Sequence, residues 1–420
     1  MREMKDSGVQ WIGAIPVDWK IDNPQYHFSQ RKDRAKQGMV QLTASQKYGV
    51  ITQTEYMERT GANIVTVQKD FDILKLVCAG DFVIHMRSFQ GGLEYSEKTG
   101  SISSAYVMLI PSNTIREPRY YKWFFKSSNY IDALSSTSNL VRDGQAMRWS
   151  NFIQLPILFP PAEEQQRIAD FLDAKCAEID ALTADIQTQI DTLEQYKRSV
   201  ITETVTKGLN PDAEMKDSGI QWIGNMPAHW DVIRGKYILR YMQKPVREDD
   251  GVITCFRDGE VTLRSNRRED GFTMSDKEIG YQGIDVGDLV VHGMDGFAGS
   301  IGISNSRGKA SPVLNVLDTD QCKRYIMYYL RSMAYSDVFL ALATGIRVRS
   351  CDLRWNKLAE LSYPVPPLDE QNAIVKHIDS VLSKADAVIA DKKAQLATLD
   401  EYKKSLIFEY VTGKKEVPVS

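Results

Sequence analysis

Residues 4–19 read MKDSGVQWIGAIPVDW, and residues 215–230 read MKDSGIQWIGNMPAHW. The two stretches are identical at 11 of 16 positions and start 211 residues apart, so chance does not explain them. A pattern that returns at a fixed distance indicates an internal duplication, which constrains the fold more strongly than any single residue does. The 420-residue chain is therefore expected to contain two copies of one structural unit.

Further pairs of blocks recur in the same order along the chain. They are GDFVIH at 80–85 with GDLVVH at 287–292, RYYKWFFKS at 119–127 with RYIMYYLRS at 324–332, PPAEEQQRI at 160–168 with PPLDEQNAI at 366–374, and YKRS at 196–199 with YKKS at 402–405. Each copy thus consists of a short block, a body and a helical segment. We predict a first globular domain with its N-terminal block at 1–159, a helix at 160–210, a second globular domain at 211–365 and a second helix at 366–420.

The two bodies combine the patterns of strands and of helices. Residues 71–86 and 284–294 are rich in β-branched residues interrupted by glycine turns, as strands are. Residues 120–136 carry apolar residues at helical spacing. The sequence therefore predicts two mixed α+β domains rather than pure β barrels.

Residues 161–205 give the clearest helical pattern. Apolar residues repeat at intervals of seven at Leu172, Ile179, Ile186, Leu193 and Val200, and the second stripe of a coiled-coil seam is expected at Leu182 and Tyr196. The C-terminal copy, at about 367–411, has a wider apolar stripe at Ile374, Ile378, Val381, Leu382, Ala385, Val388, Ile389, Leu396, Leu399, Tyr402 and Leu406.

The heptads alone leave two arrangements open, because each helix can pack on its own domain or on the other helix. The duplication favours the second arrangement, a long antiparallel coiled coil with one domain at each end and pseudo-twofold symmetry. A helix of about 45 residues is ~67 Å long, which is comparable to two turns of B-DNA. The helices are therefore expected to act as a spacer.

Charge is distributed unevenly along the chain. The net charge of −3 by itself argues against a nucleic-acid binder. Residues 20–160 nevertheless contain 17 Lys and Arg against 12 Asp and Glu, whereas residues 161–207 contain 5 against 10, and residues 231–365 contain 19 against 18. A basic surface is expected in the first body, and in the second body only where basic residues cluster locally.

Several classes of protein are disfavoured by what the sequence lacks. It has no stretch typical of a signal peptide or a membrane span, so a cytoplasmic location without membrane contact is expected. The five cysteines lack the paired spacing of zinc or redox sites. No P-loop, GxGxxG, HExxH or GxSxG motif occurs.

Two features resemble parts of active sites. Residues 23–26, Asn-Pro-Gln-Tyr, are similar to the Asn-Pro-Pro-Tyr loop of amino-methyltransferases, but they differ at the third position and have no glycine-rich cofactor loop upstream. A turn before a strand is the preferred interpretation. His85 and His292 occupy equivalent places in apolar strands, and we expect them to be strand-end histidines with satisfied hydrogen bonds.

The remaining polar residues suit nucleic-acid recognition, with Arg and Lys for phosphates and guanine edges and Gln and Asn for adenine. The candidate DNA-binding residues are Arg31, Lys32, Arg34, Lys36, Arg87, Gln90, Arg142, Gln145 and Arg148 in the first body, and Lys244, Arg247, Arg264, Arg267, Arg268, Arg347 and Arg349 in the second. For any one of them a solvated surface position explains the residue equally well. The loops at 140–147 and 345–351 stand out, because each precedes a shared Arg-Trp pair and yet differs between the copies.

The repeated SGVQWIG...P..W block, the PP..EQ..I helix start and the Tyr-Lys-(Arg/Lys)-Ser ending resemble the specificity (S) subunit of Type I restriction-modification systems over nearly the whole chain. The resemblance implies that each body is a target-recognition domain that reads one half of a split, asymmetric site in double-stranded DNA. It also implies that the paired helices set the unread spacer and bind two modification (methyltransferase) subunits, and through them restriction (motor-nuclease) subunits. S-adenosylmethionine, ATP and Mg would belong to these partners, and the chain itself would be non-catalytic and without a cofactor.

Two other functions stay open at this point. A methyltransferase would bind S-adenosylmethionine by itself. A coiled-coil scaffold would join proteins without DNA readout, and the nearly neutral second body is compatible with it. DNA binding in the presence of the modification partner separates these functions.

Overall fold

The computed structural model describes residues 2–64, 66, 73–137, 147–267, 279–342 and 353–418. The chain divides into two compact units. The first comprises residues 1–186 and 394–420, and the second comprises residues 187–393. Each unit contains one globular domain, the start of one long helix and the end of the other.

The first unit is built around a four-stranded antiparallel sheet in the order β4-β11-β8-β9. Its strands are β4 (Phe28–Arg31), β11 (Val107–Pro111), β8 (Phe82–Ile84) and β9 (Glu94–Tyr95). Two-stranded sheets pair β1 (Met4–Asp6) with β2 (Ala14–Pro16), β3 (Lys20–Asp22) with β12 (Ile157–Phe159), β5 (Leu42–Ser45) with β6 (Gly49–Thr52), and β7 (Lys75–Val77) with β10 (Gly100–Ile102). The helices are η1 (Pro24–Tyr26), α1 (Gln53–Thr60), α2 (Ser88–Gly91), α3 (Pro118–Phe124), α4 (Ser128–Ser136) and α5 (Trp149–Phe152).

The second unit repeats this design with the sheet β16-β23-β20-β21. Its strands are β16 (Leu239–Met242), β23 (Leu314–Thr319), β20 (Leu289–His292) and β21 (Ile301–Ile303). Two-stranded sheets pair β13 (Met215–Asp217) with β14 (Asn225–Pro227), β15 (Asp231–Arg234) with β24 (Ser362–Val365), β17 (Ile253–Cys255) with β18 (Val261–Leu263), and β19 (Gln282–Ile284) with β22 (Gly308–Ala310). The helices are α7 (Gly235–Ile238), η3 (Arg264–Asn266), η4 (Gly296–Ala298), α8 (Lys323–Tyr335), α9 (Val338–Ala341) and α10 (Trp355–Glu360).

The strand orders of the two sheets correspond one to one, so the duplication of the sequence is a duplication of the fold. The repeated Gly-Asp pairs at 80–81 and 287–288 precede the equivalent strands β8 and β20. The prediction of two mixed α+β domains is confirmed. Residues 23–26, expected to form a turn before a strand, contain the single-turn helix η1 ahead of β4.

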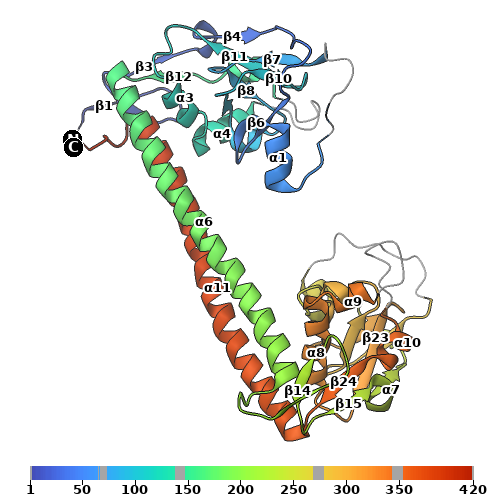
Figure 1. Ribbon diagram of the computed structural model, residues 1–420. Helices are drawn as coiled ribbons and strands as arrows, with labels where there is room; N and C mark the ends of the chain where they lie inside the picture. Colours follow the sequence, from blue (N-terminus) through green and yellow to red (C-terminus); the bar gives the residue numbers. More distant parts are fainter. Residues whose placement is uncertain are drawn as a thin grey trace. The chain divides into compact units, whose positions relative to one another are not determined.

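The predicted long helices are α6 (Ala162–Lys207) and α11 (Leu368–Val411). In the first unit, the ring of Phe171 lies 4.5 Å from that of Tyr410, and Lys403 Nζ lies 2.5 Å from Asp180 Oδ1. In the second unit, Lys197 Nζ lies 2.5 Å from Asp386 Oδ1. Residue numbers at successive contacts rise along α6 and fall along α11. The helices therefore run antiparallel within each unit, as predicted (Figure 1).

The second stripe of the seam differs from the prediction. Leu172, Ile179 and Ile186 are buried as expected, but Leu182 and Tyr196 are exposed. The second buried position follows the first by four residues, as Cys176 follows Leu172 and Ile190 follows Ile186. Leu182 and Tyr196 follow the first stripe by only three residues, which turns their side chains away from the seam. On α11, Val388 and Tyr402, which the sequence also placed in the apolar stripe, are exposed as well.

Each domain is fastened to both helices by the same pair of hydrogen bonds. In the first unit, buried Trp19 donates its indole N–H to Glu164 Oε2 at the start of α6 (2.9 Å). Tyr120 donates its hydroxyl to the carbonyl of Val411 at the end of α11 (2.7 Å). Trp19 therefore anchors the N-terminal block on the first turn of α6.

The second unit carries the equivalent bonds on equivalent residues. Trp230, also buried, donates to Glu370 Oε2 (3.1 Å), and Tyr325 donates to the carbonyl of Val205 (3.0 Å). Both tyrosines are buried, so their hydroxyls have no access to bulk water. The docking of helix ends on each domain therefore depends on directional bonds as well as on apolar packing.

We expect Tyr120→Phe to lower the free energy of unfolding by about 1–2 kcal/mol, because it leaves the buried carbonyl of Val411 without its donor. Urea denaturation followed by circular dichroism measures this change. Tyr26→Phe is the control, because Tyr26 is 68% exposed, and its effect should stay within a few tenths of a kcal/mol. Equal stability of the two variants would contradict the role of this bond.

Candidate nucleic-acid interface

The candidate DNA-binding residues differ in exposure. Exposed are Lys32, Arg34, Lys36, Arg87, Gln90, Arg148, Arg247 and Arg267, and partly buried are Arg31, Lys244 and Arg264. Arg142, Gln145, Arg268, Arg347 and Arg349 lie outside the described residues, as do 140–146 and 345–351. Their assignment stays a prediction.

Arg31 and Lys244 are held by equivalent aspartates. Arg31 makes a two-pronged contact with Asp81, with Nε 2.7 Å from Oδ2 and Nη2 2.9 Å from Oδ1. Lys244 Nζ lies 2.8 and 2.7 Å from the two carboxylate oxygens of Asp288 and 2.9 Å from Asp285 Oδ2. Asp81 and Asp288 are the aspartates of the repeated Gly-Asp turns. The geometry favours a structural role for both cations, as partners of buried carboxylates.

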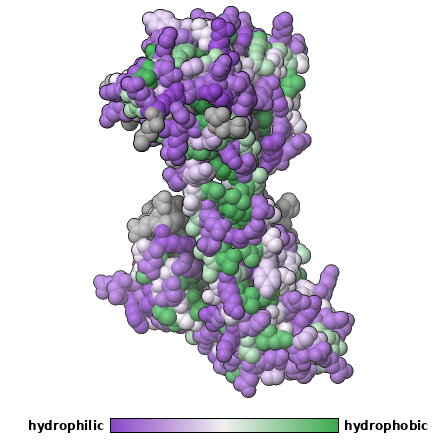
Figure 2. Space-filling view, turned by 90° about the vertical axis from the view of Figure 1, so that its left-hand side faces the viewer, coloured by the Kyte–Doolittle hydropathy of each residue, from purple (hydrophilic) through white to green (hydrophobic). Residues whose placement is uncertain are grey.

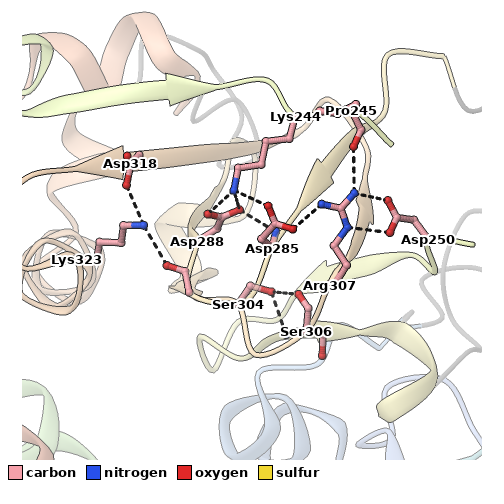
Figure 3. Close-up of polar contacts among 11 residues, drawn as sticks. Lys244, Pro245, Asp250, Asp285, Asp288, Ser304, Ser306, Arg307, Asp318 and Lys323 are labelled. Carbon is pink, nitrogen blue, oxygen red and sulfur yellow. Dashed lines mark hydrogen bonds and ion pairs between the residues drawn. The ribbon is translucent and has the colours of Figure 1, made fainter. Parts of the chain in front are cut away.

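A larger ion network surrounds Lys244 in the second unit (Figure 3). Arg307 contacts Asp250 through Nε (2.9 Å) and Nη2 (2.8 Å) and contacts Asp285 through Nη1 (2.6 Å). The hydrogen bonds from Lys244 and Arg307 lower the pKa of Asp285 to about 2. Asp285 is therefore ionised at every physiological pH, and the two cations are committed to the domain's own carboxylates.

The exposed candidates of the first unit lie on loops and at the ends of short elements. Lys32, Arg34 and Lys36 follow β4, and Arg34 Nη1 donates to the carbonyl of Ile73 (3.0 Å). Arg87 precedes α2, to which Gln90 belongs, and Arg148 precedes α5. These positions leave the long side chains at the surface, where groups on a nucleic acid are accessible to them.

In the second unit, the structure brings Arg264 and Arg267 to one pocket of about 720 Å³. The pocket lies beside β17 and the end of β20 and also contains Phe256, Arg257, Asp258, His292, Asp295 and Ser300. Lys244 and Arg247 are not among the residues that line it. A concave site with several N–H donors is suited to an electron-rich ligand.

The cations of this pocket are oriented by carboxylates. Arg267 Nη1 lies 3.0 Å from Asp258 Oδ1, and its guanidinium carbon lies 4.3 Å from the centre of the Phe256 ring. Arg257 Nη2 lies 3.0 Å from Asp295 Oδ1. These contacts fix the guanidinium groups before a ligand arrives while leaving them partly exposed.

Arg257 and Phe256 were not among the residues predicted from the sequence. The signal that could have found them is local, because Arg257 directly precedes the Asp258-Gly259 turn of a hairpin between β17 and β18. A cation at a hairpin turn is held in a fixed, exposed place. Arg257 is only 7 residues from Arg264 in the sequence, but the sequence does not show that both side chains line one pocket.

The described residues around the pocket include one thiol, that of Cys255. Burial raises the pKa of the Cys255 thiol well above its usual range, so it stays protonated and is a poor nucleophile. Within the described parts of the chain, no group of three or more His, Cys, Asp or Glu residues is placed to hold a metal ion. No helix among these residues is long and apolar enough to span a membrane.

Residues 26–192 match the family model of the Type I restriction modification DNA specificity domain. The chain is 22% identical to the Type I restriction enzyme MjaVIII specificity subunit of Methanocaldococcus jannaschii, over 96% of this chain and 94% of that protein. It is also 22% identical to the EcoBI specificity subunit of Escherichia coli, over 71% of this chain and 67% of that protein. Residues 26–192 thus match the DNA specificity domain, and over most of its length the chain is similar to Type I restriction-modification specificity subunits.

A solved chain from work on "complex assembly and conformational transition of the type I R-M system" has the same fold, with a TM-score of 0.65 and 14% identity over 96% of this chain and 99% of that one. At this identity the likeness concerns the fold alone. The matching DNA specificity domain and the names of these relatives point to DNA recognition within a restriction-modification system.

We expect Arg31→Ala to lower the free energy of unfolding by about 3 kcal/mol, because Asp81 is only 2% exposed and would lose the partner of its charge. Lys32→Ala, one residue away and exposed, is the matched control and should change stability by less than about 0.5 kcal/mol. Chemical denaturation measures both. If Arg31→Ala is as stable as the control while it weakens DNA binding, Arg31 is a DNA contact and the structural role is wrong.

Proposed function

We propose that this chain is the non-catalytic reader of a Type I restriction-modification complex, in which each globular domain contacts one half of a bipartite, asymmetric DNA site. One observation carries the proposal. Both units use the same frame, with Trp19 and Trp230 on equivalent glutamates, but they present different polar surfaces on that frame. Two domains of one fold with unlike surfaces suit two unlike half-sites.

The long helices support a fixed spacer between the half-sites. α6 is one unbroken helix of 46 residues, and α11 is one of 44. At 1.5 Å per residue, α6 is ~69 Å long, or about two turns of B-DNA. In this proposal the helices set the length of the stretch of bases that neither domain contacts.

Two equivalent surfaces on the helices support the binding of two modification subunits. In the first unit, Leu182 on α6 and Tyr402 on α11 are 48% and 54% exposed. Lys403, which follows Tyr402, forms an ion pair with Asp180, which is two residues from Leu182. Leu182 and Tyr402 therefore lie at the same level along the helix pair. We name these two residues the first docking patch.

The second docking patch consists of Val388 and Tyr196, which are 45% and 51% exposed. Tyr196 neighbours Lys197, whose ion pair with Asp386 falls two residues from Val388. Both patches therefore repeat the same aromatic, aliphatic and ion-pair arrangement. Figure 2 shows hydrophobic side chains gathered along the helices on a face that is otherwise largely hydrophilic. Two like patches fit two copies of one partner.

The chemistry is assigned to the partners in this proposal. The modification subunits would use S-adenosylmethionine, and the restriction subunits, which join through them, would use ATP and Mg. The specificity subunit would need no cofactor for its own task. The alternative is a coiled-coil scaffold that joins proteins without reading DNA.

The proposal is tested by incubating the chain together with its modification subunit with a pool of random-sequence DNA duplexes and sequencing the bound fraction. We expect two blocks of preferred bases separated by a stretch without preference. A single block would contradict the bipartite site. Absence of any preference, with the protein complex intact, would favour the scaffold.

The docking patches are tested by Leu182→Glu with Tyr402→Glu, and separately by Val388→Glu with Tyr196→Glu. Each pair should weaken binding of one modification subunit at least tenfold, because a carboxylate replaces apolar area at the contact. Mass photometry should then show one bound subunit instead of two, and none when all four residues are changed. Gln195→Glu, on another side of α6, is the control. Two bound subunits in every variant would refute the assignment.

A further inference from the structure

His292 and His85 stand at equivalent places and share one hydrogen-bonding role. His292 ends β20, and its Nδ1 accepts the backbone N–H groups of Met294 (3.2 Å) and Asp295 (2.9 Å). His85 follows β8, and its Nδ1 accepts the backbone N–H of Arg87 (3.3 Å). Because Nδ1 is an acceptor in both, the neutral ring carries its proton on Nε2. Of the two ring nitrogens, it is Nδ1 that makes the hydrogen bonds expected of a strand-end histidine.

The Nε2 edges of the two rings have different surroundings. His85 is 5% exposed, and its Nε2 has no hydrogen-bond partner among the described residues, although Glu94 Oε1 lies 3.6 Å away. The side chain of His292 is 19% exposed and lines the pocket of Arg264 and Arg267. Its Nε2 lies 3.9 Å from Asp295 Oδ2, which is too far for a hydrogen bond. Among the described residues, it is the donor of His292, in the second unit, that lines this pocket.

His292 is an uncharged donor near neutral pH. Burial lowers its pKa, and the charge of Arg257 acts in the same direction, while Asp295 opposes them. The ring therefore offers one directional N–H, and the charge in the pocket comes from the arginines. Ser300, which lines the same pocket, is 1% exposed, and its Oγ has no hydrogen-bond partner within the described part of the chain.

The donors of this pocket suit a tetrahedral anion. Three guanidinium groups line it, from Arg257, Arg264 and Arg267, against two carboxylates, from Asp258 and Asp295. Asp258 takes two of the N–H groups of Arg267, and a guanidinium has five. A phosphate projects from the DNA backbone and can enter a concave site, whereas base edges lie inside the grooves and are reached by protruding side chains.

We propose that this pocket is a seat for one backbone phosphate of the second half-site, with the His292 Nε2–H and the guanidinium of Arg267 donating to its oxygens. The inference rests on the proposed function and adds a register-setting contact, which fixes where the second domain lies on the duplex without reading a base. The first unit has no equivalent donor at His85, whose ring is buried.

The test uses His292→Asn with the modification subunit present. An asparagine Oδ1 can still accept the backbone N–H groups two and three residues ahead, so the turn is kept while the Nε2–H is lost. His85→Asn is the matched control, because it changes the same turn in the first unit without touching the pocket. Fluorescence anisotropy measures affinity for the selected duplex and for duplexes with single base changes.

We expect His292→Asn to weaken binding about tenfold for every duplex, with the order of base preferences unchanged, and His85→Asn to bind as the wild type does. Arg267→Gln should in addition make the dependence of log affinity on log salt shallower by about one, because one neutralised phosphate is lost. Replacing the seated phosphate of the duplex by an uncharged methylphosphonate should lower the affinity of the wild type about tenfold. The same replacement should lower the affinity of His292→Asn little further.

Three outcomes would overturn the inference. Altered base preferences in His292→Asn would make the residue a base reader, and equal affinity of His292→Asn and the wild type would leave the pocket without a phosphate. Both outcomes spare the proposed function, because the wild type still binds selectively. A wild-type complex that binds no DNA at all would remove the proposed function and the phosphate seat together.

Discussion

The fastening of each domain to the first turn of one long helix is the interaction on which the rest of the structure depends. Glu164 and Glu370 stand at the N-terminal ends of α6 and α11, where the helix dipole favours a negative charge. Each accepts the N–H of a fully buried tryptophan, Trp19 or Trp230. A glutamate thus stabilises its helix end and fixes the orientation of the domain that precedes it. The hydroxyls of Tyr120 and Tyr325 bind the C-terminal end of the other long helix by donating to a backbone carbonyl there.

This frame explains which residues the two copies can change. The residues of the anchors must be retained, because each is buried and bonded, and the aspartates of the Gly-Asp turns must keep a cation beside them. Arg31 in the first unit and Lys244 in the second satisfy that requirement with different chemistry. Residues at hairpin turns and in pocket walls do not have to be retained for these contacts. Divergence is therefore possible where a ligand would be contacted, with little effect on folding.

The sequence predicted the features that repeat and missed those that depend on side-chain direction. The duplication predicted two mixed domains and the antiparallel helices, because an internal repeat constrains architecture whatever the individual residues are. Leu182 and Tyr196 were assigned to the seam because apolar residues usually fill it, yet a spacing of three instead of four turns them to the surface. Arg31 and Lys244 were named as candidate DNA-binding residues, and nothing in the sequence indicated their buried carboxylate partners, which are about 40 to 50 residues away in the chain. The pocket joins Arg257 to Arg267 and His292, and only the folded hairpin shows that they meet.

The paired charges also explain how a chain with a net charge of −3 can face DNA. A surface of unpaired lysines would bind any polyanion and would gain little from a particular register. In the pocket of the second unit, by contrast, carboxylates orient the guanidinium groups and reduce the net charge of the site. The uncharged histidine there offers a directional N–H donor but attracts no anion at long range. Non-specific attraction is weakened by this arrangement, while a correctly placed acceptor still meets oriented donors. For a protein that must distinguish one site from a great excess of other DNA, weak general attraction combined with exact local geometry favours selectivity over affinity.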